Sequence, residues 1–529
     1  MVRPLLLLLF IVVRPLLFII SVSKIKIKKD LYATGRWNLL GITLHHGSLN
    51  LSLRNKTVSG VKWTSLSMVI VTVTQLLQLV ILARFLSPVE FGLMAIMMVV
   101  IGFSQAFMDM GISNAIIHRQ QISHTQLSSL YWLNIFSGLV LFCIVFLLAP
   151  LIAGFYEEPG LLEPLMWLSS VFIIVAIGNQ YRILCQKELQ FNLMAKVEMT
   201  AAVVSLTVAV VLAIKGFGVY ALVGAMLAQA SVSSLLFLII GFKQHHRPAF
   251  VYHHRDLKGF YSFGLYQMGE RSINYIGTNV DKLLIGKFVG MEATGFYNMA
   301  WHLIIYPVSK INPVINKVAF PVYAKVQENS EALNRYYSLT VRALSLVTVP
   351  ILAFLGLHSS DVVLVVFGEG WETTATLVAF LSLIGILRAL GNPGGAIVLA
   401  LGHAHAGFLW NLFWVPLIFI SLYVALNINP SVEVVPMVLL GLSLTFGWGW
   451  HFMIAYYAKI RYLNVALHFL KIMIVCFVIA WLSKELINAL DISNAFVRLA
   501  IAGLVCGLLY LPYLYLFENE ILSLARKGK

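Results

Sequence analysis

The chain has 529 residues, of which 60% are hydrophobic and only 11% are charged, and its mean hydropathy is +0.88. An ordinary soluble domain is about a quarter charged, so this composition excludes a soluble globular protein. The formal charge of +15 lies mainly in short loops between apolar segments. That pattern favours a polytopic membrane protein over a nucleic-acid-binding one.

The first fifty residues differ in character from the rest. The sequence VRPLL occurs twice there, and a basic run, Lys24 to Lys29, follows. The segment resembles a signal peptide or an anchor, but Arg14 and Pro15 interrupt its apolar run and no small-residue cleavage site follows. We therefore expect residues 1–50 to be an atypical extension of the gene model, and the natural chain to begin at Leu51.

Apolar stretches fill nearly all of the remaining sequence. A membrane span needs about 20 mostly apolar residues, because the hydrocarbon core is about 30 Å thick and a helix rises about 1.5 Å per residue. We predict an all-α polytopic membrane protein with about fourteen transmembrane helices. Their approximate residue ranges are 61–83, 91–108, 130–150, 162–181, 197–214, 218–241, 259–288, 294–320, 338–357, 373–391, 407–426, 434–457, 465–482 and 496–517.

Basic residues mark alternate loops and so predict the sidedness of the chain. One set of loops carries most of the Lys and Arg residues, including the tail after Arg526. The opposite set is acidic or bare, as in FYEEPGLLEP (155–164) and in residues 358–372, which contain no Lys or Arg. The positive-inside rule then places both termini in the cytoplasm, which requires an even number of spans.

The two halves of the chain are related by an internal repeat. A shift of 203 residues aligns LARFLSPVEFGLM (82–94) with IGKFVGMEATGFY (285–297), so that Gly92 falls on Gly295. Six spans separate the copies, which therefore have the same orientation. Parallel repeats of this kind form two bundles with the substrate site at their interface. We predict bundles at residues 51–258 and 259–458, with residues 459–529 as an appended helix pair and basic tail.

The seventh span combines acidic and basic side chains on one helical face. At about 100° per residue, its polar side chains occupy roughly a third of the circumference: Gln267, Glu270, Arg271, Asn274, Thr278, Asp281 and Lys282. A buried charge costs at least about 2.5–3.5 kcal/mol in hydrocarbon, so these groups must face protein or water. We interpret this polar stripe as the lining of a substrate cavity. The alternative is that the same residues only pack helices together.

Other candidate residues have weaker signals. Asp109, Lys310 and Arg388 lie in or near predicted spans and are secondary candidates for the cavity, although simple placement at the membrane interface fits Asp109 and Arg388 better. His403 and His405 form an isolated HxH in a loop, which is more typical of a loop than of a metal site. We find no phosphate-binding loop, catalytic triad or dinucleotide motif, and we therefore predict no metal, no cofactor and no enzymatic activity.

Four sequence segments carry a family resemblance. They are SLRNKTVSGVKWTSLS near the first span, LARFLSPVEFGLMA, FMDMGISNAIIHRQ after the second span, and YIGTNVDKLLIGKFVGMEATGFYNMA in the second half. From Leu51 onward the chain resembles Wzx-type polysaccharide flippases of the multidrug/oligosaccharidyl-lipid/polysaccharide exporter superfamily, in the branch of colanic acid and teichuronic acid exporters. Residues 1–50 depart from that pattern.

The resemblance implies two six-helix bundles around a V-shaped cavity. It implies translocation of an undecaprenyl-diphosphate-linked oligosaccharide across the cytoplasmic (inner) membrane by alternating access, with possible H⁺ or Na⁺ coupling. The partners implied are the lipid-linked oligosaccharide, membrane lipid, and a polysaccharide polymerase with glycosyltransferases, and no nucleic acid. Arg271 would contact phosphate or sugar, while Glu270 and Asp281 would position the basic residues or take up a coupling proton.

Three other functions remain as alternatives at this point. A cation-coupled drug antiporter of the same superfamily would also use an embedded carboxylate, but usually has twelve spans. A membrane glycan polymerase or ligase tends to carry a large outer loop with catalytic Arg or His residues, whereas the outer loops here are short. A structural scaffold fits the number of spans but assigns no purpose to the charged stripe.

Overall fold

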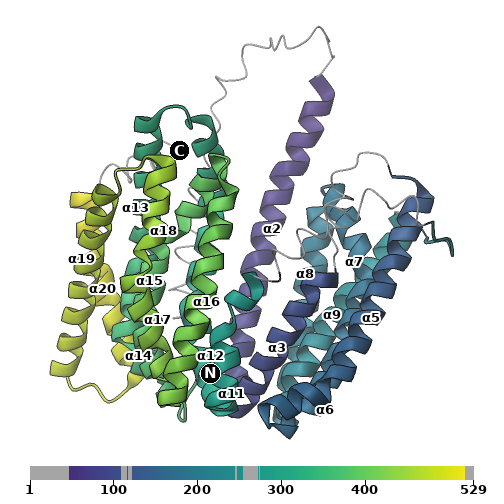
Figure 1. Cartoon of the computed structure of the whole chain (residues 1–529), viewed down its shortest axis with the longest axis horizontal. Helices are drawn as coiled ribbons and strands as arrows, with labels where there is room; N and C mark the ends of the chain where they lie inside the picture. The colour runs from purple at the N-terminus through teal and green to yellow at the C-terminus, as the bar shows by residue number, and fades with distance from the viewer. Residues whose placement is uncertain are drawn as a thin grey trace. The chain divides into compact units, whose positions relative to one another are not determined.

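The computed structural model describes residues 47–108, 116, 122–244, 247–253, 272 and 274–518. The described residues form helices joined by short turns, and none of them lies in a strand. This confirms the predicted all-α class. The chain divides into two compact units, the first within Asn38–Gly295 and the second within Phe296–Lys529 (Figure 1).

The described helices of the first unit follow one another with short connections. They are α2 (Gly47–Leu82), α3 (Pro88–Met108), α5 (His124–Tyr156), η2 (Pro159–Leu161), α6 (Leu162–Ser169), α7 (Val171–Lys187), α8 (Phe191–Ile214), α9 (Val219–Gln244) and α11 (Val280–Phe288). The first five residues of α12 (Met291–Lys325) also belong to this unit. Thus the first unit contains a segment that the sequence repeat assigns to the second half of the chain.

The described part of the second unit holds the remainder of α12 and eight further helices. They are α13 (Ser330–Leu357), α14 (Ser359–Val366), α15 (Glu372–Ala400), α16 (Ala404–Ile428), α17 (Val434–Thr445), α18 (Trp448–Ala458), α19 (Tyr462–Ala489) and α20 (Ala495–Phe517). The helices α19 and α20, drawn in yellow in Figure 1, correspond to the predicted appended pair, and α19 packs along α13. The two compact units are defined by contacts between residues, whereas the predicted domain boundaries are based on the sequence repeat. Those boundaries remain a prediction.

Twelve helical stretches in the described part of the chain are long and apolar enough to cross a membrane. They match the predicted spans except the seventh and the eighth. Most of the predicted seventh span lies outside the described residues, and α12, which covers the eighth, is not among the twelve. The structure therefore confirms a polytopic membrane protein, while the count of fourteen remains a prediction.

Local signals in the sequence explain where α5 begins and ends. At its start, the Ser123 hydroxyl accepts a hydrogen bond from the Gln126 amide at 3.2 Å. The Gln126 side chain accepts one from the Ser123 amide at 3.1 Å in return. This reciprocal pair is a capping box, which satisfies two amides that a helix leaves free. At its end, Glu157 adopts a left-handed conformation with φ 56° and terminates the helix.

The helices associate through buried polar contacts and close packing. Lipid tails are as apolar as leucine, so apolar burial alone does not drive helices together in a membrane. In the first unit, the buried Asn134 amide donates to the Ala176 carbonyl at 2.8 Å, and Gln180 donates to the Leu127 carbonyl at 2.8 Å. Both bonds join α5 to α7 and fix the register of these two helices.

Candidate functional site

Part of the predicted stripe lies outside the residues that the structure describes. Gln267, Glu270 and Arg271 lie outside the described residues, and so does Asp109. Lys310 is on α12, but its side chain also lies outside the described part. Their assignment to a substrate cavity therefore remains a prediction.

The described residues of the stripe lie on either side of a break in the helix. Residues 274–277 are helical, Thr278 and Asn279 form a turn, and α11 begins at Val280. The Thr278 hydroxyl donates to the carbonyls of Asn274 at 3.1 Å and of Tyr275 at 3.0 Å, so it is bonded within its own segment. Because the helix is interrupted, the even rotation assumed from the sequence does not continue across Asn279.

Exposure changes across this break. The side chains of Asn274 and Thr278 are exposed, whereas Asp281 is buried, with 6% of its surface exposed. A carboxylate oxygen of Asp281 accepts a hydrogen bond from the Lys282 amide at 2.9 Å. The Lys282 side chain is half-buried. Asn274 and Thr278 therefore differ in environment from the acid–base pair that follows them.

The segment before α11 is attached to α3 by Tyr275. Its hydroxyl donates to the Met98 carbonyl at 3.0 Å. The ring lies over Gly102, where a Cβ atom would be 2.0 Å from the Tyr275 hydroxyl oxygen. Gly102 thus leaves the space in which this aromatic side chain reaches the α3 backbone.

The far end of α11 is held by an ion pair that sequence reasoning did not identify as part of a site. The Lys287 ammonium group donates to Glu157 Oε1 at 2.9 Å and to the Phe155 carbonyl at 2.8 Å. The hydrogen bond and the positive charge of Lys287 lower the pKa of the Glu157 carboxyl group below its ordinary value. Glu157 is 81% exposed, so this contact is accessible to water.

Near this ion pair, α3 and the start of α12 meet at two glycines that the repeat relates to each other. A Cβ atom at Gly92 on α3 would be 1.8 Å from the Met291 carbonyl oxygen, and one at Gly295 would be 1.8 Å from the Pro88 carbonyl oxygen. The shift of 203 residues that relates Gly92 to Gly295 also relates Pro88 to Met291. The contact is therefore reciprocal: Gly92 meets the carbonyl of Met291, and Gly295 meets the carbonyl of Pro88, the residue that the repeat relates to Met291. Only residues without a Cβ allow this approach. We call it the glycine crossing.

Other sequence candidates lie in the second unit. The exposed Arg388 side chain on α15 places its guanidinium carbon 4.8 Å from the centre of the Trp301 ring, a cation–π contact. The rings of His403 and His405 meet edge to face, and both rings contact Tyr457. Among the described residues, no group of three or more His, Cys, Asp or Glu side chains is arranged to hold a metal ion.

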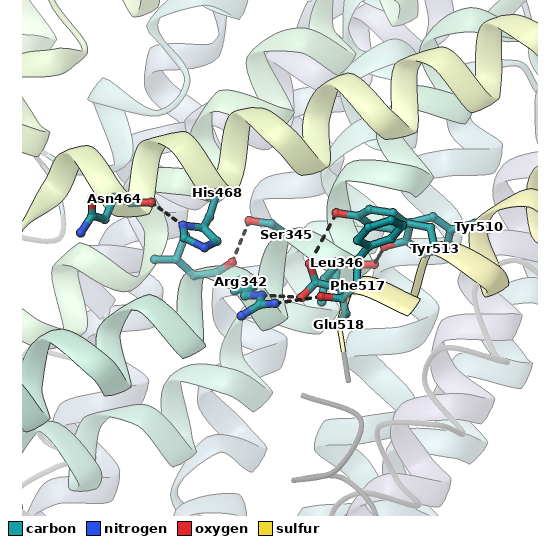
Figure 2. A network of polar contacts seen from close by, with 10 residues as sticks. Arg342, Ser345, Leu346, Asn464, His468, Tyr510, Tyr513, Phe517 and Glu518 are labelled. Atoms are coloured by element: carbon teal, nitrogen blue, oxygen red, sulfur yellow. Dashed lines mark hydrogen bonds and ion pairs between the residues drawn. The ribbon is translucent and has the colours of Figure 1, made fainter. Parts of the chain in front are cut away.

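The appended pair is fixed to α13 by a buried polar network at the end of α20, which Figure 2 shows. The Arg342 guanidinium on α13 pairs with Glu518 and also donates to the Phe517 carbonyl at 3.3 Å. Glu518 is almost fully buried, and Tyr513 donates to its other oxygen at 3.4 Å. The Tyr510 hydroxyl donates to the Leu346 carbonyl at 2.7 Å.

The chain is similar to several known proteins. A family model described as "Polysaccharide biosynthesis protein" matches residues 81–376. The teichuronic acid biosynthesis protein TuaB of Bacillus subtilis is 34% identical over 494 residues, which cover 90% of this chain and 99% of the relative. The chain belongs to the polysaccharide biosynthesis protein family. The resemblance predicted from sequence is thereby confirmed.

A further relative and two solved structures agree with this family assignment. The lipopolysaccharide biosynthesis protein WzxC of Escherichia coli is 34% identical, over 69% of this chain and 74% of its own length. Among solved structures, lipid II flippase MurJ in an inward closed conformation has a TM-score of 0.68 at 14% identity, covering 87% of this chain and 99% of that one. An inward-facing multidrug resistance transporter of the MATE family has a TM-score of 0.57 at 16% identity, covering 76% and 99%. At these identities the solved structures show a shared fold.

The contacts that sequence reasoning missed had partial signals in the sequence. Lys287 was aligned with Arg84 in the repeat, and Glu157 lay in the acidic loop FYEEPGLLEP, but the two residues are 130 positions apart and no local pattern pairs them. Gly277 and Asn279 are residue types that mark turns. They signalled the break before α11, which the continuous-helix interpretation overlooked.

Proposed function

We propose that the chain is a flippase that translocates undecaprenyl-diphosphate-linked oligosaccharide repeat units for the synthesis of a surface polysaccharide. The observation that carries this proposal is the match along 99% of a teichuronic acid biosynthesis protein. Two further relatives support it: the amylovoran biosynthesis protein AmsL of Erwinia amylovora at 30% identity, and the succinoglycan biosynthesis transport protein ExoT of Rhizobium meliloti at 25%. The fold, shared with solved membrane transporters, agrees with it.

The polar stripe supplies the chemistry that this cargo requires. A diphosphate-sugar headgroup needs a hydrated and partly cationic path, while the polyprenyl tail remains in lipid. In this proposal Arg271 binds the diphosphate, because a guanidinium group can donate two parallel hydrogen bonds to phosphate oxygens. Glu270 and Asp281 position the basic residues or take up a coupling H⁺; Na⁺ is the other candidate ion.

Alternating access requires contacts that form and break during each cycle. The glycine crossing and the Lys287–Glu157 ion pair are suited to this purpose, because neither leaves a buried charge unpaired when it opens: the glycines present only backbone, and the carboxylate of Glu157 is already exposed to water. We propose that both contacts open when the cargo leaves the protein.

The setting of this activity follows from the same proposal. The protein resides in the bacterial cytoplasmic (inner) membrane with both termini in the cytoplasm, as the distribution of Lys and Arg predicts. It receives cargo completed by glycosyltransferases and delivers it to a polysaccharide polymerase.

Complementation tests the proposal. The gene is deleted in its host, and surface polysaccharide and lipid-linked intermediates are measured after restoring the full chain, Arg271→Ala, Glu270→Gln or the control Arg461→Ala, which changes an arginine between α18 and α19. We expect the full chain and the control to restore the polymer and the two stripe variants to accumulate intermediates. Unchanged polysaccharide with altered sensitivity to cationic drugs would instead identify an antiporter. Full export by Arg271→Ala and Glu270→Gln at normal expression would refute the roles assigned to the stripe.

A further inference from the structure

A polar cavity lies in the second unit where α13 meets the appended helix pair. It has a volume of about 350 Å³ and is formed by the end of α13, the start of α14, the end of α19 and the start of α20. Its charged and polar lining includes His358, Asp361, Lys484, Asn488, Asp491 and Arg498. The volume falls within the range of about 300–1,000 Å³ that is usual for small-molecule sites.

Two of the four charged groups in this cavity neutralise each other. The Arg498 Nε atom donates to Asp361 Oδ1 at 3.0 Å, and the guanidinium forms an ion pair with the same carboxylate. Arg498 also donates to the carbonyls of Ile492 at 2.9 Å and Ser493 at 3.2 Å. Together with a second bond to Asp361, these bonds use four of the five guanidinium N–H groups, so Arg498 and Asp361 build the wall of the cavity.

The other two charges are left for a ligand. Lys484 and Asp491 line the same cavity, and within the described part of this unit neither side chain forms a hydrogen bond or an ion pair. Asp491 directly follows the C-cap of α19 with φ 45°, the left-handed conformation in which helices commonly end and which aspartate adopts more readily than most residues. The cavity thus presents one free cation and one free anion.

The surroundings of the cavity identify the class of ligand. The large apolar side chains Leu486, Leu490 and Val497 lie on the same helix ends and are 43%, 52% and 41% exposed. In a membrane protein such residues contact acyl chains. These side chains place the cavity at the edge of the lipid-facing surface, so a phospholipid can set its headgroup in the polar cavity while its tails lie along them.

We propose that this cavity binds the headgroup of a zwitterionic phospholipid with a primary ammonium group. Lys484 binds the phosphate, and Asp491 accepts hydrogen bonds from the ammonium group. The bound lipid joins the turn between α19 and α20 to α13 and α14, next to the Arg498–Asp361 ion pair. This site shares no residue with the predicted stripe and does not depend on the identity of the cargo.

Lipid titration of the purified full chain in detergent tests this assignment. Native mass spectrometry would compare short-chain phosphatidylethanolamine with phosphatidylcholine, whose quaternary ammonium group cannot donate a hydrogen bond, and with anionic phosphatidylglycerol. We expect phosphatidylethanolamine to bind about tenfold more tightly than either of the other lipids, the loss expected for one charge-assisted contact.

Variants separate the two contacts. Lys484→Gln is expected to weaken binding of phosphatidylethanolamine about tenfold and Lys484→Arg to retain it, because arginine also binds phosphate. Asp491→Asn, which tolerates the left-handed backbone, is expected to abolish the preference over phosphatidylglycerol. Glu485→Gln is the control: it changes an exposed carboxylate on the same helix that does not line the cavity. Equal affinity for the three lipids, or an equal loss in Glu485→Gln and Lys484→Gln, would overturn the assignment.

Discussion

Two contacts between helices, one in each unit, are built from opposite chemistry. In the first unit, α3 meets the start of α12 through two glycines, and the neighbouring Lys287–Glu157 ion pair is open to water. In the second unit, α13 holds the end of α20 through Arg342 and Glu518, whose side chains are only 17% and 4% exposed. Separating the first contact exposes backbone and a solvated carboxylate, whereas separating the second leaves a buried charge without its partner. The difference indicates that the first contact can open and the second is permanent.

The largest expected effect comes from the permanent contact. Arg342→Ala leaves the Glu518 carboxylate buried without its cation, and we expect a loss of about 3–5 kcal/mol of folding free energy. Thermal unfolding in detergent, followed by circular dichroism, measures it. Replacing both partners, as in Arg342→Met with Glu518→Leu, should restore most of the stability, because no charge then remains unpaired. A double variant as unstable as the single one would show that packing, not the charge pair, holds α20.

The glycine crossing should respond to a single added methyl group. Gly92→Ala or Gly295→Ala places a Cβ atom against a carbonyl oxygen, and overpacking of this kind typically costs about 1–3 kcal/mol. We expect both variants to lose surface polysaccharide in the complementation assay through loss of the closed contact. Gly507→Ala on α20 is the matched control, since no heavy atom lies within 4 Å of its added Cβ atom. Normal export by Gly92→Ala would contradict a role for the crossing.

Acid should weaken the second unit through His358, which lies between α13 and α14 and borders the cavity described above. Burial lowers the pKa of His358 from 6.5 to about 4. The folded pKa is below the unfolded one, so the contribution of the neutral ring is fully present above about pH 6.5 and is lost as the pH falls towards 4. At pH 5 the loss is about 2 kcal/mol.

Unfolding curves at pH 7.5 and pH 5 check this expectation for His358. Nearby Asp361, Lys484 and Arg498 also face the ring or its cavity, so His358→Gln supplies the baseline. This variant should show a smaller difference between the two pH values than the natural chain. An identical pH dependence would assign the acid sensitivity to other groups.

The smallest expected effect on stability concerns the ion pair beside the crossing. Glu157→Gln removes an exposed charge, and surface ion pairs contribute about 0–1 kcal/mol, so the unfolding temperature should barely change. The Lys287 ammonium group keeps its bond to the Phe155 carbonyl in this variant. A loss as large as that of Arg342→Ala would show that the Lys287–Glu157 contact is structural and does not open.

The sequence predicted the fold class and the family, because apolar length and the alternation of charged loops are local properties of the chain. It also aligned Gly92 with Gly295, but the carbonyl that each glycine meets depends on how two helices cross. Arg342 and Glu518 are 176 residues apart, and no local pattern predicts their pairing. The predicted stripe assumed one continuous helix, whereas Thr278 and Asn279 form a turn that separates Asn274 from Asp281.

The central claim is that the contact between the end of α5 and α11 opens during transport. Cysteines at positions 157 and 287, in a chain whose four natural cysteines are replaced, would be joined by a short, reducible bis-thiosulfonate reagent in cells that synthesise the polysaccharide. Our account predicts that cross-linking stops export and that reduction restores it, while either single cysteine has no effect. Undiminished export by fully cross-linked protein would contradict the claim.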